Sequence, residues 1–348
     1  MSLSRDAISR LEKHFSQMAN SYSISASAIA SGFNPNGEVI PKFFSQGLLA
    51  VSSSEAHPLN DINIVMVEDR QGEGFLDTGG NPCTGRTNTD TTDRETHSLV
   101  GKPSKYETKE TQCDVHIPFG IINKWAVAAG SKQYSNNVQN SFSQKYSKFV
   151  QERVALDSLN IGFNGMSAAA STTPGSKLTD VNKGWIAVVK EQMPAQIIDS
   201  ALTVGSGVGA SYKNLDAAVA DILDICITSS HRHGLVCIIS DNLIADERNR
   251  VYNNVDFIPE KKNTADTFSH FGGLDRVVIP NFPDNTIVVT SLSNLSIYIK
   301  ESTTYRQITS NHKRNRVEDY QHREEAYIVE NMEKFAAITN LTPLEVVE

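Results

Sequence analysis

The sequence predicts a mixed α+β fold, because segments with helical periodicity alternate with short apolar runs typical of strands. The strongest helical pattern lies at residues 135–160. Residues 235–239 form a continuous apolar run of the kind found in buried central strands. A long Gly- and Thr-rich stretch at residues 70–112 interrupts this ordered pattern. Together these observations indicate a folded body from which extended elements project.

The composition excludes several classes of protein. The chain has 348 residues, enough for two domains, and its 39% hydrophobic and 21% charged content is ordinary for a globular protein. A net charge of -8 disfavours a dedicated nucleic-acid-binding protein, which would need clustered Lys and Arg. The four cysteines lack C-x-x-C spacing, which is typical of a reduced, cytoplasmic chain rather than of a disulfide framework. No apolar run reaches the roughly 18 residues of a membrane span, so no membrane partner is expected.

The first 41 residues predict a helix followed by a linker. Apolar residues at positions 8, 11, 15 and 18 fall on one face of a helix over residues 1–20. This helix is either docked on the main domain or a detachable segment that associates with copies of itself. Residues 21–41 are rich in Ser and Ala and end in Gly and Pro, which is linker composition. Residues 62–67 then predict a strand.

The stretch at residues 70–112 cannot close a core of its own. It holds nine Thr and six Gly among many charged residues and few large apolar side chains. It is therefore either a surface loop or a two-stranded arm that is stable only when laid on another surface. The residues assigned to the arm are Gly72, Gly74, Phe75, Gly79, Gly80 and Lys109.

A long helix, further helices and strands follow in alternation. Val138, Phe142, Tyr146 and Phe149 recur at spacings of four, four and three and predict the core face of the helix at 135–160, with glycines 162 and 165 ending it. The later pattern predicts helices at 181–192, from 214 to about 226, and from 241 to about 253. Strands are predicted at 235–239, 276–279, 286–290 and 296–300, and an extended region at 303–339.

No motif predicts an active site, a cofactor or a metal. The run Gly205-Ser-Gly-Val-Gly209 has G-x-G-x-G spacing rather than G-x-G-x-x-G, and its surroundings show no strand-turn-helix pattern. His231-Arg-His233 and Cys113-x-x-His116 offer too few ligands for a tetrahedral site. We therefore predict no catalytic, cofactor-binding or metal-binding residues, and no enzyme.

Several stretches, in order, resemble a known family. They are Leu156-Asp-Ser-Leu159 with Gly162-Phe-Asn-Gly165, Asp180-Val181 with Gly184-Trp185 and Pro194-Ala195, Leu215-Asp-Ala217, residues 235–246, residues 292–298, and Arg316-Val-Glu-Asp-Tyr320. In these the chain resembles the major capsid proteins of P2-like tailed bacteriophages (Caudoviricetes), which have the HK97-type capsid fold. The resemblance covers residues 115–340 well and the preceding part weakly.

The resemblance implies a layout for the whole chain. Residues 1–65 would form an N-terminal arm, with an assembly (scaffold-like) segment at 1–33, and residues 66–113 the extended E-loop. Residues 114–179 would form the peripheral domain with its spine helix at 135–160. Residues 180–300 would form the axial domain, and residues 301–348 would return to the peripheral domain as long strands.

The resemblance also implies a function and partners. The chain would self-assemble as pentamers and hexamers into the icosahedral head that encloses the double-stranded DNA of a tailed phage. Its partners would be other copies of itself, a portal, a scaffold, a protease, decoration proteins, and packaged DNA bound without sequence preference. It would assemble in the cytoplasm of the bacterial host and reside in the virion. A phage protease would cleave near Gly32, Phe33 and Asn34.

Two alternatives stay open at this point. An encapsulin-like cellular nanocompartment would have the same fold but would package protein cargo instead of DNA. A small-molecule enzyme would use the loop at residues 205–209, and a Gly207→Asp substitution would abolish its ligand binding.

Overall fold

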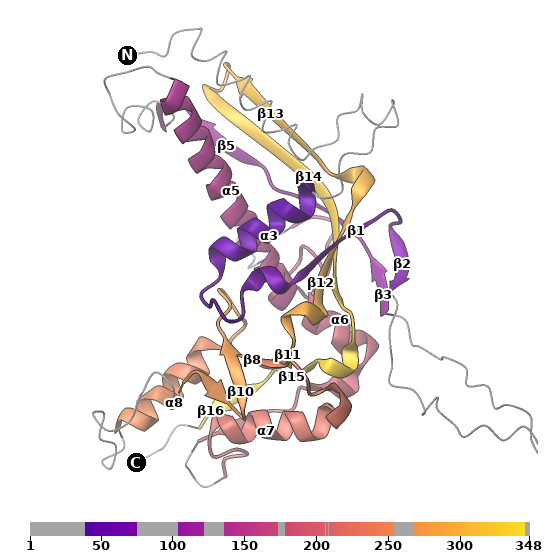
Figure 1. Cartoon of the computed structure of the whole chain (residues 1–348), viewed down its shortest axis with the longest axis vertical. Helices are drawn as coiled ribbons and strands as arrows, with labels where there is room; N and C mark the ends of the chain where they lie inside the picture. The colour runs from indigo at the N-terminus through magenta and orange to yellow at the C-terminus, as the bar shows by residue number, and fades with distance from the viewer. Residues whose placement is uncertain are drawn as a thin grey trace, which may run out of the picture. The chain divides into compact units, whose positions relative to one another are not determined.

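The computed structural model describes residues 39–74, 104–121, 136–172, 178–205, 207, 209–253 and 268–344 (Figure 1). Helices and strands alternate along the chain, which confirms the mixed α+β class. The chain divides into two compact units. Unit 1 comprises residues 1–70, 107–184 and 296–327, and unit 2 comprises residues 71–106, 185–295 and 328–348.

The sheet of unit 1 is built around one long strand, β14 (Arg316–Val329). Its other strands are β1 (Asn63–Val67), β4 (Lys109–Gln112), β5 (Val115–Pro118), β12 (Leu295–Lys300) and β13 (Tyr305–Asn311). The order is β1-β12-β14-β13, and β4 and β5 also pair with β14. β13 and β14 form an antiparallel hairpin from the pair Tyr305–His322 to the pair Asn311–Arg316, as Figure 1 shows.

Two helices of unit 1 pack against each other. Helix α3 (Val39–Val51) is followed by the short 3₁₀ helix η1 (Leu59–Asp61), and α5 (Asn136–Asn164) is the long helix that the periodicity predicts. Leu48 of α3 is completely buried, and Val150 and Val154 of α5 are each only 1% exposed. At Gly47 the backbones approach so closely that a Cβ atom would lie 2.7 Å from the carbonyl oxygen of Gln151. The sequence analysis assigned no helix to the segment that forms α3.

The C-terminus of α5 is fixed by a second close backbone approach. The amide of Gly165 donates to the Ile161 carbonyl (2.8 Å), and the amide of Gly184 donates to the Gly165 carbonyl (3.0 Å). A Cβ atom on Gly184 would lie 2.3 Å from the Gly162 carbonyl oxygen, and one on Gly165 would lie 2.3 Å from the Asn182 carbonyl oxygen. The helix therefore continues through Gly162 and ends at Asn164, later than predicted, because the segment at 182–184 covers its last turn.

Unit 2 is a six-stranded mixed sheet with helices packed on it. The sheet order is β6 (Ile197–Ile198), β15 (Ala336–Ile338), β11 (Ile287–Thr290), β8 (Val236–Ile239), β10 (Leu274–Val277) and β9 (His270–Phe271). The helices are α6 (Trp185–Gln192), α7 (Leu215–Cys226) and α8 (Asp241–Asn253). β7 (Leu202–Val204) pairs in parallel with β16 (Leu341–Pro343). Helix α7 buries Val219 and Ile222 in a core shared with Ile287 and Val289 of β11.

The end of the chain departs from the predicted layout. Residues 301–348 were assigned as a whole to the peripheral domain, but residues 328–348 group with unit 2. In that unit β15 pairs with β11 and β6, and Ala336, Ala337 and Ile338 are completely buried. The segment is therefore divided between the two units, since an extended pattern does not reveal which sheet a strand joins. The named roles of the domains stay predictions.

We expect the Gly165–Gly184 contact to be sensitive to a single methyl group. Gly184→Ala should lower the free energy of unfolding by about 1–3 kcal/mol, since the new Cβ would overlap a backbone oxygen. Gly120→Ala is the matched control, because nothing lies within 4 Å of the added Cβ, and it should change stability by less than about 0.5 kcal/mol. Urea unfolding of the full chain measures both. Equal midpoints for the two variants would contradict the packing described above.

Candidate assembly interface

The root of the predicted arm is a two-stranded ribbon. β2 (Gln71–Gly74) pairs with β3 (Ser104–Glu107), and residues 75–103 join the two strands. Gly72 faces the ring of Tyr106 so closely that a Cβ atom would lie 2.6 Å from the phenol oxygen. The glycine therefore allows the tyrosine ring to cover the ribbon, and an aromatic ring across a strand glycine stabilises such a pair.

In unit 2 a side-chain amide holds the ribbon. The Lys105 amide donates to Oε1 of Gln192 (3.3 Å), and Nε2 of Gln192 donates to the Lys105 carbonyl (3.0 Å). The Gln192 side chain thus makes both hydrogen bonds that a neighbouring strand would make. This pair ties the ribbon edge to the last turn of α6.

In unit 1 both ends of the arm segment meet one buried carboxylate. The Thr108 amide donates to the Arg70 carbonyl (2.9 Å), and the Thr108 hydroxyl donates to Glu324 Oε2 (3.1 Å). Arg70 Nε and Lys300 Nζ lie 3.6 and 3.9 Å from the same oxygen. The Glu324 side chain is only 5% exposed. The residues before and after the arm are therefore anchored to β14 at one point.

Not every residue assigned to the arm belongs to it. Lys109 lies in β4, where it pairs with Glu325 of β14, and its ammonium group contacts the Glu107 carboxylate (2.7 Å). Its assignment to the arm was wrong, because β4 already belongs to the sheet of unit 1. Gly72 and Gly74 lie in β2. Phe75, Gly79 and Gly80 lie outside the described residues, as does the expected cleavage region at Gly32, Phe33 and Asn34.

The hairpin next to this anchor is held by a buried ion pair. The Arg306 guanidinium donates to both carboxylate oxygens of Asp319, at 2.8 and 2.5 Å, and each side chain is 1% exposed. The phenol of Tyr146 on α5 donates to Asp319 Oδ2 (2.7 Å). Burial, together with the Asp319 charge, raises the pKa of Tyr146. Gln321 Nε2 also donates to Asp319 Oδ2 (3.4 Å). The carboxylate is thus satisfied by four hydrogen bonds, as a buried charge requires.

A second buried pair follows along β14. Arg323 Nε donates to Glu325 Oε2 (2.6 Å), and the Tyr327 hydroxyl donates to Glu325 Oε1 (3.1 Å). Burial and the Glu325 charge raise the pKa of Tyr327 well above its usual value. The Arg323 guanidinium also lies 5.3 Å from the centre of the Phe44 ring, which is a cation–π distance. This contact connects the second pair to α3.

Two of the four residues predicted for the core face of the long helix differ in their burial. Tyr146 is 2% exposed, whereas Phe149 is 53% exposed and is not a core residue of the chain. The buried stripe passes through residues 146, 150 and 154, and a residue three positions after 146 is turned away from it. The side chains of Val138 and Phe142 lie outside the described part of the helix.

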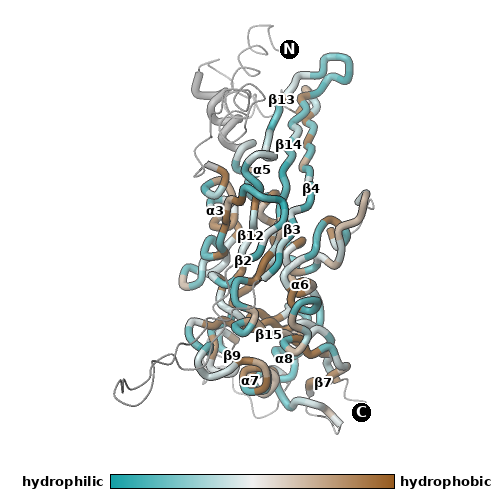
Figure 2. The backbone as a smooth tube through the Cα atoms, turned by 90° about the vertical axis from the view of Figure 1, so that its right-hand side faces the viewer, coloured by the Kyte–Doolittle hydropathy of each residue, from teal (hydrophilic) through white to brown (hydrophobic). Residues whose placement is uncertain are grey.

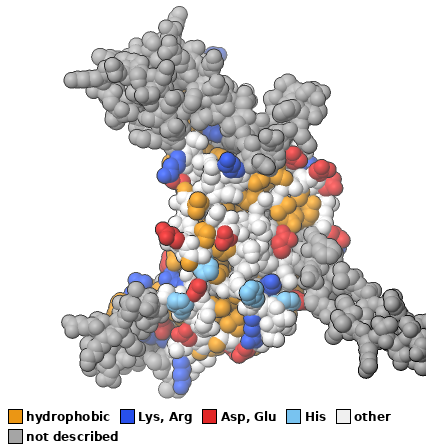
Figure 3. Space-filling model, viewed as in Figure 1, with side chains coloured by type: hydrophobic (Ala, Val, Ile, Leu, Met, Phe, Trp, Pro, Cys, Tyr) orange, Lys and Arg blue, Asp and Glu red, His pale blue; other side chains and the backbone are white. Residues whose placement is uncertain are grey.

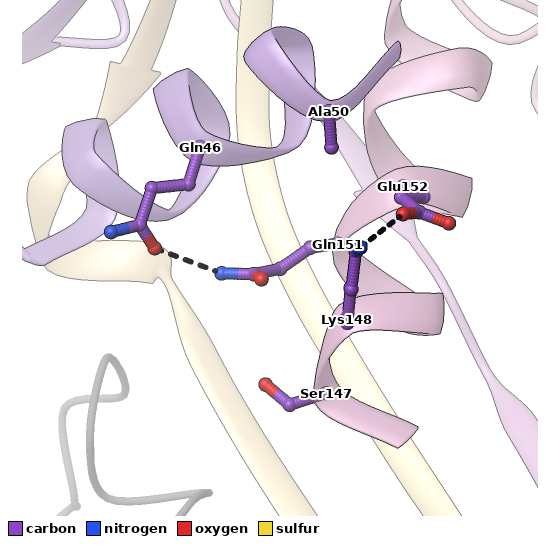
Figure 4. A pocket seen from close by; sticks show the side chains of 6 residues that line it. All are labelled: Gln46, Ala50, Ser147, Lys148, Gln151 and Glu152. Atoms are coloured by element: carbon purple, nitrogen blue, oxygen red, sulfur yellow. Dashed lines mark hydrogen bonds and ion pairs between the residues drawn. The ribbon is translucent and has the colours of Figure 1, made fainter. Parts of the chain in front are cut away.

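A shallow groove of about 400 Å³ separates the exposed edges of α3 and α5. Figure 4 shows Gln46 of α3 pointing toward Gln151 of α5, with a hydrogen bond of 3.4 Å between their side-chain amides. Lys148 and Glu152 form an ion pair at 3.7 Å on the same helix. The side chains that line the groove are therefore largely polar, and the two charged ones, Lys148 and Glu152, pair with each other.

The loop that the enzyme alternative would use packs on the protein itself. It follows β7 and precedes α7, so a strand and a helix do flank it, contrary to the sequence analysis. However, α7 begins only at Leu215, and the side chain of Asn214 caps the Ala217 amide (2.9 Å). A Cβ atom on Gly207 would lie 2.7 Å from the Leu344 side chain. Within the described residues, no group of three or more His, Cys, Asp or Glu side chains could hold a metal ion.

The sequence matches the family described as phage major capsid protein, P2 family, over residues 10–341. The chain belongs to this family. It is 28% identical to the capsid proteins of Escherichia phage P2 over 326 residues, covering 85% of this chain and 86% of that protein. It is 25% identical to the major capsid protein of Serratia phage KSP20 over 350 residues, covering 95% of each.

Solved capsid structures share the fold. A chain of the satellite phage P4 procapsid with its size determination (Sid) protein superposes with a TM-score of 0.73 at 23% identity, covering 99% of both chains. A chain of the capsid of an empty GTA particle gives a TM-score of 0.51 at 10% identity, covering 84% of this chain and 89% of that chain. The HK97-type capsid fold expected from the sequence is confirmed.

These matches identify the function of this P2-family chain. It is a major capsid protein of a tailed phage, a structural protein of the virion that assembles with copies of itself into a shell. The encapsulin alternative has less support, because the matching family and relatives are phage capsid proteins.

Among the described residues, none of the helices combines the length and the apolar character that a membrane-spanning helix needs. The face drawn in Figure 3 carries acidic, basic and hydrophobic side chains intermingled.

Sequence reasoning did not find the residues that fix the arm and the hairpin. Glu324, Thr108 and Gln192 are ordinary polar residues in the sequence, and no spacing connects them. The one available signal was the density of charges in residues 316–325, where acidic and basic residues alternate within an extended region. Most of these charged side chains are buried, whereas charges in an extended segment are normally exposed.

We expect the loss of one partner of the Arg306–Asp319 pair to destabilise the fold strongly, and the replacement of both partners by apolar residues to change stability little. Arg306→Met alone should lower the free energy of unfolding by about 3–5 kcal/mol, because Asp319 would stay buried without its cation. The double variant Arg306→Met, Asp319→Leu should recover most of that loss. Lys148→Ala, which removes the exposed pair with Glu152, should cost less than about 1 kcal/mol.

Denaturant unfolding of the wild type, the single variants Arg306→Met and Asp319→Leu, and the double variant gives the coupling energy of the buried pair. A double variant that is less stable than Arg306→Met would show that the ion pair stabilises the hairpin more than an apolar pair would.

Proposed function

We propose that this chain forms an icosahedral head from pentamers and hexamers, and that the ribbon β2–β3 carries an arm that crosses a neighbouring subunit. Two observations carry the proposal. Gln192 holds the edge of the ribbon in unit 2, and Glu324 in unit 1 holds the residues just before and after it along the chain, Arg70 and Thr108. Membership of a phage capsid family supports a neighbouring copy of the chain as the surface that the arm lies on.

The partners of the proposed shell follow from its task. Portal, scaffold and decoration proteins would contact it, and packaged double-stranded DNA would lie inside. The net charge of -8 suits a container, since a strongly basic wall would bind the polyanion along its path and resist its movement. The proposal includes no catalytic step.

The arm can be tested by a shortening that leaves its anchors intact. Deletion of residues 72–109 would also remove Thr108 and Lys109, which belong to the sheet contacts of unit 1. A sharper variant replaces residues 76–102 by a short Gly- and Asn-rich linker. The shortened chain should stay soluble with an unchanged unfolding midpoint and should form no shells, because each subunit loses the contacts that link it to its neighbours.

The assay is co-expression with the neighbouring head genes, followed by sedimentation and negative-stain microscopy. The wild-type chain should give icosahedral particles whose contents include DNA. Shells of normal yield from the shortened chain would refute the arm. A wild-type chain that stays dispersed and turns over a small molecule would refute the proposed shell function itself.

N-terminal processing is a separate part of the proposal. A phage protease would remove residues 1 to about 33 after they have acted in assembly, leaving a new terminus near Gly32, Phe33 or Asn34. Intact-mass spectrometry of mature particles should then show a chain that lacks this segment. An intact terminus at Met1 or Ser2 in mature particles would contradict the processing.

A further inference from the structure

The turn of the β13–β14 hairpin presents two cations at its tip. Residues 312–315 between the strands are all exposed and include Lys313 and Arg314. Figure 2 shows the turn as a hydrophilic end of the hairpin. No described residue pairs with the side chain of Lys313 or Arg314. We call these two residues the basic tip.

The turn holds the basic tip in a defined conformation. The Arg314 amide donates to the Asn311 carbonyl (3.2 Å) and to Asn311 Oδ1 (3.1 Å). Asn315 adopts a positive φ of 53°. The Phe119 amide donates to the Asn315 carbonyl (3.1 Å), and the Phe119 and His312 rings lie 5.8 Å apart. The cations are therefore carried on a braced turn.

The acidic residues close to the basic tip are already neutralised. Glu318 accepts a hydrogen bond from Arg316 Nε (2.6 Å), and Asp319 is paired with Arg306. The hydrogen bonds from Tyr320 and Arg316 hold the pKa of Glu318 below its usual value. The tip cations thus need an acidic partner from elsewhere.

One acidic pair of the described chain matches them. Adjacent acidic residues occur at 68–69, 246–247, 318–319 and 324–325 of the described sequence. Each of the last three pairs contacts cations of the same chain. The pair at 246–247 contacts Arg250, and the pair at 318–319 contacts Arg316 and Arg306. The pair at 324–325 contacts Lys300 and Arg323. Glu68 and Asp69 are exposed, and no cation among the described residues pairs with them.

The basic tip cannot reach this acidic pair within one subunit. Asp69 adjoins Arg70, whose guanidinium contacts Glu324 (3.6 Å). From Glu324 to Arg316, β14 is continuous strand and spans about 26 Å at about 3.3 Å per residue. That distance exceeds the reach of the side chains and the screening length of about 8 Å at physiological salt.

We propose that Lys313 and Arg314 of one subunit bind Glu68 and Asp69 of another subunit in the shell. The inference rests on the proposed function, because it requires copies to assemble. The two patches carry equal and opposite charge, two residues each, on one chain that assembles with itself, so complementarity selects a second copy over DNA as the partner. The contact joins the hairpin end of one subunit to the start of the arm of its neighbour.

Charge reversal with rescue tests the contact. The variants are K313E/R314E, E68K/D69K and the combination of all four, each co-expressed as the full chain with the head genes. Each double variant should lower the yield of sedimenting particles by about tenfold or more, because the contact repeats in every subunit. The combined variant should restore at least half of the wild-type yield. K42E/K213E is the control for net charge, since both lysines are exposed, and it should assemble normally.

Zero-length carbodiimide crosslinking of wild-type particles provides a second measurement that needs no variant. Mass spectrometry should find Lys313 joined to Glu68 or Asp69 in particles and not in the unassembled chain. Double variants that assemble like the wild type, a combined variant without rescue, or particles without this crosslink would each overturn the inference. If the K313E/R314E variant forms normal shells that fail to retain DNA, the partner of the basic tip is DNA and the inference is overturned. If the wild type and the control form no particles, the proposed function itself fails.

Discussion

The bidentate pair between Arg306 and Asp319 is the interaction on which unit 1 depends. Both side chains are almost completely buried, and an unpaired charge in their place would destabilise the fold by several kcal/mol. Tyr146 brings the long helix to the same carboxylate, so one acidic side chain connects α5, β13 and β14. The register of the hairpin and its docking on the helix are therefore set together, because a shift of one residue would separate the charges.

This mode of stabilisation suits a protein that must remain soluble before it assembles. A long hairpin held by apolar contacts would expose an apolar strand surface on the unassembled subunit, and such surfaces pair with other chains unselectively. In β14 the charges at Arg323 and Glu325 are instead satisfied within the subunit, and Phe44 covers the guanidinium. The subunit thus obtains a rigid extended element without a large apolar face, at the cost that every buried charge needs its own partner.

The sequence predicted those elements whose stability comes from apolar periodicity. The central strand β8, the helix α7 and most of α5 follow from the spacing of Val, Ile and Leu, since these residues face the core wherever the element lies. The buried charges of β14 could not be predicted, because a charge in an extended segment is normally exposed and only its partner across the sheet makes burial possible. Phe149 and Lys109 were misplaced for a related reason: periodicity gives a face, but tertiary contacts decide which edge of that face is covered. The Glu324 anchor joins residues far apart in sequence, and no local pattern encodes it.

A shell also limits how strong each contact between subunits can be. A misplaced subunit must be able to leave before its neighbours close around it, so individual contacts have to be weak, and exposed ion pairs contribute only about 0–1 kcal/mol each. Stability then comes from number. An arm and a hairpin that contact neighbouring subunits, as proposed above, would add several linked contacts that reinforce one another through effective concentration. The structure separates the two requirements: strong buried pairs such as Arg306–Asp319 lie inside the subunit, where they form once during folding. Exposed groups at residues 68–69 and 312–315 would then serve the proposed contacts between subunits, which must form reversibly many times over.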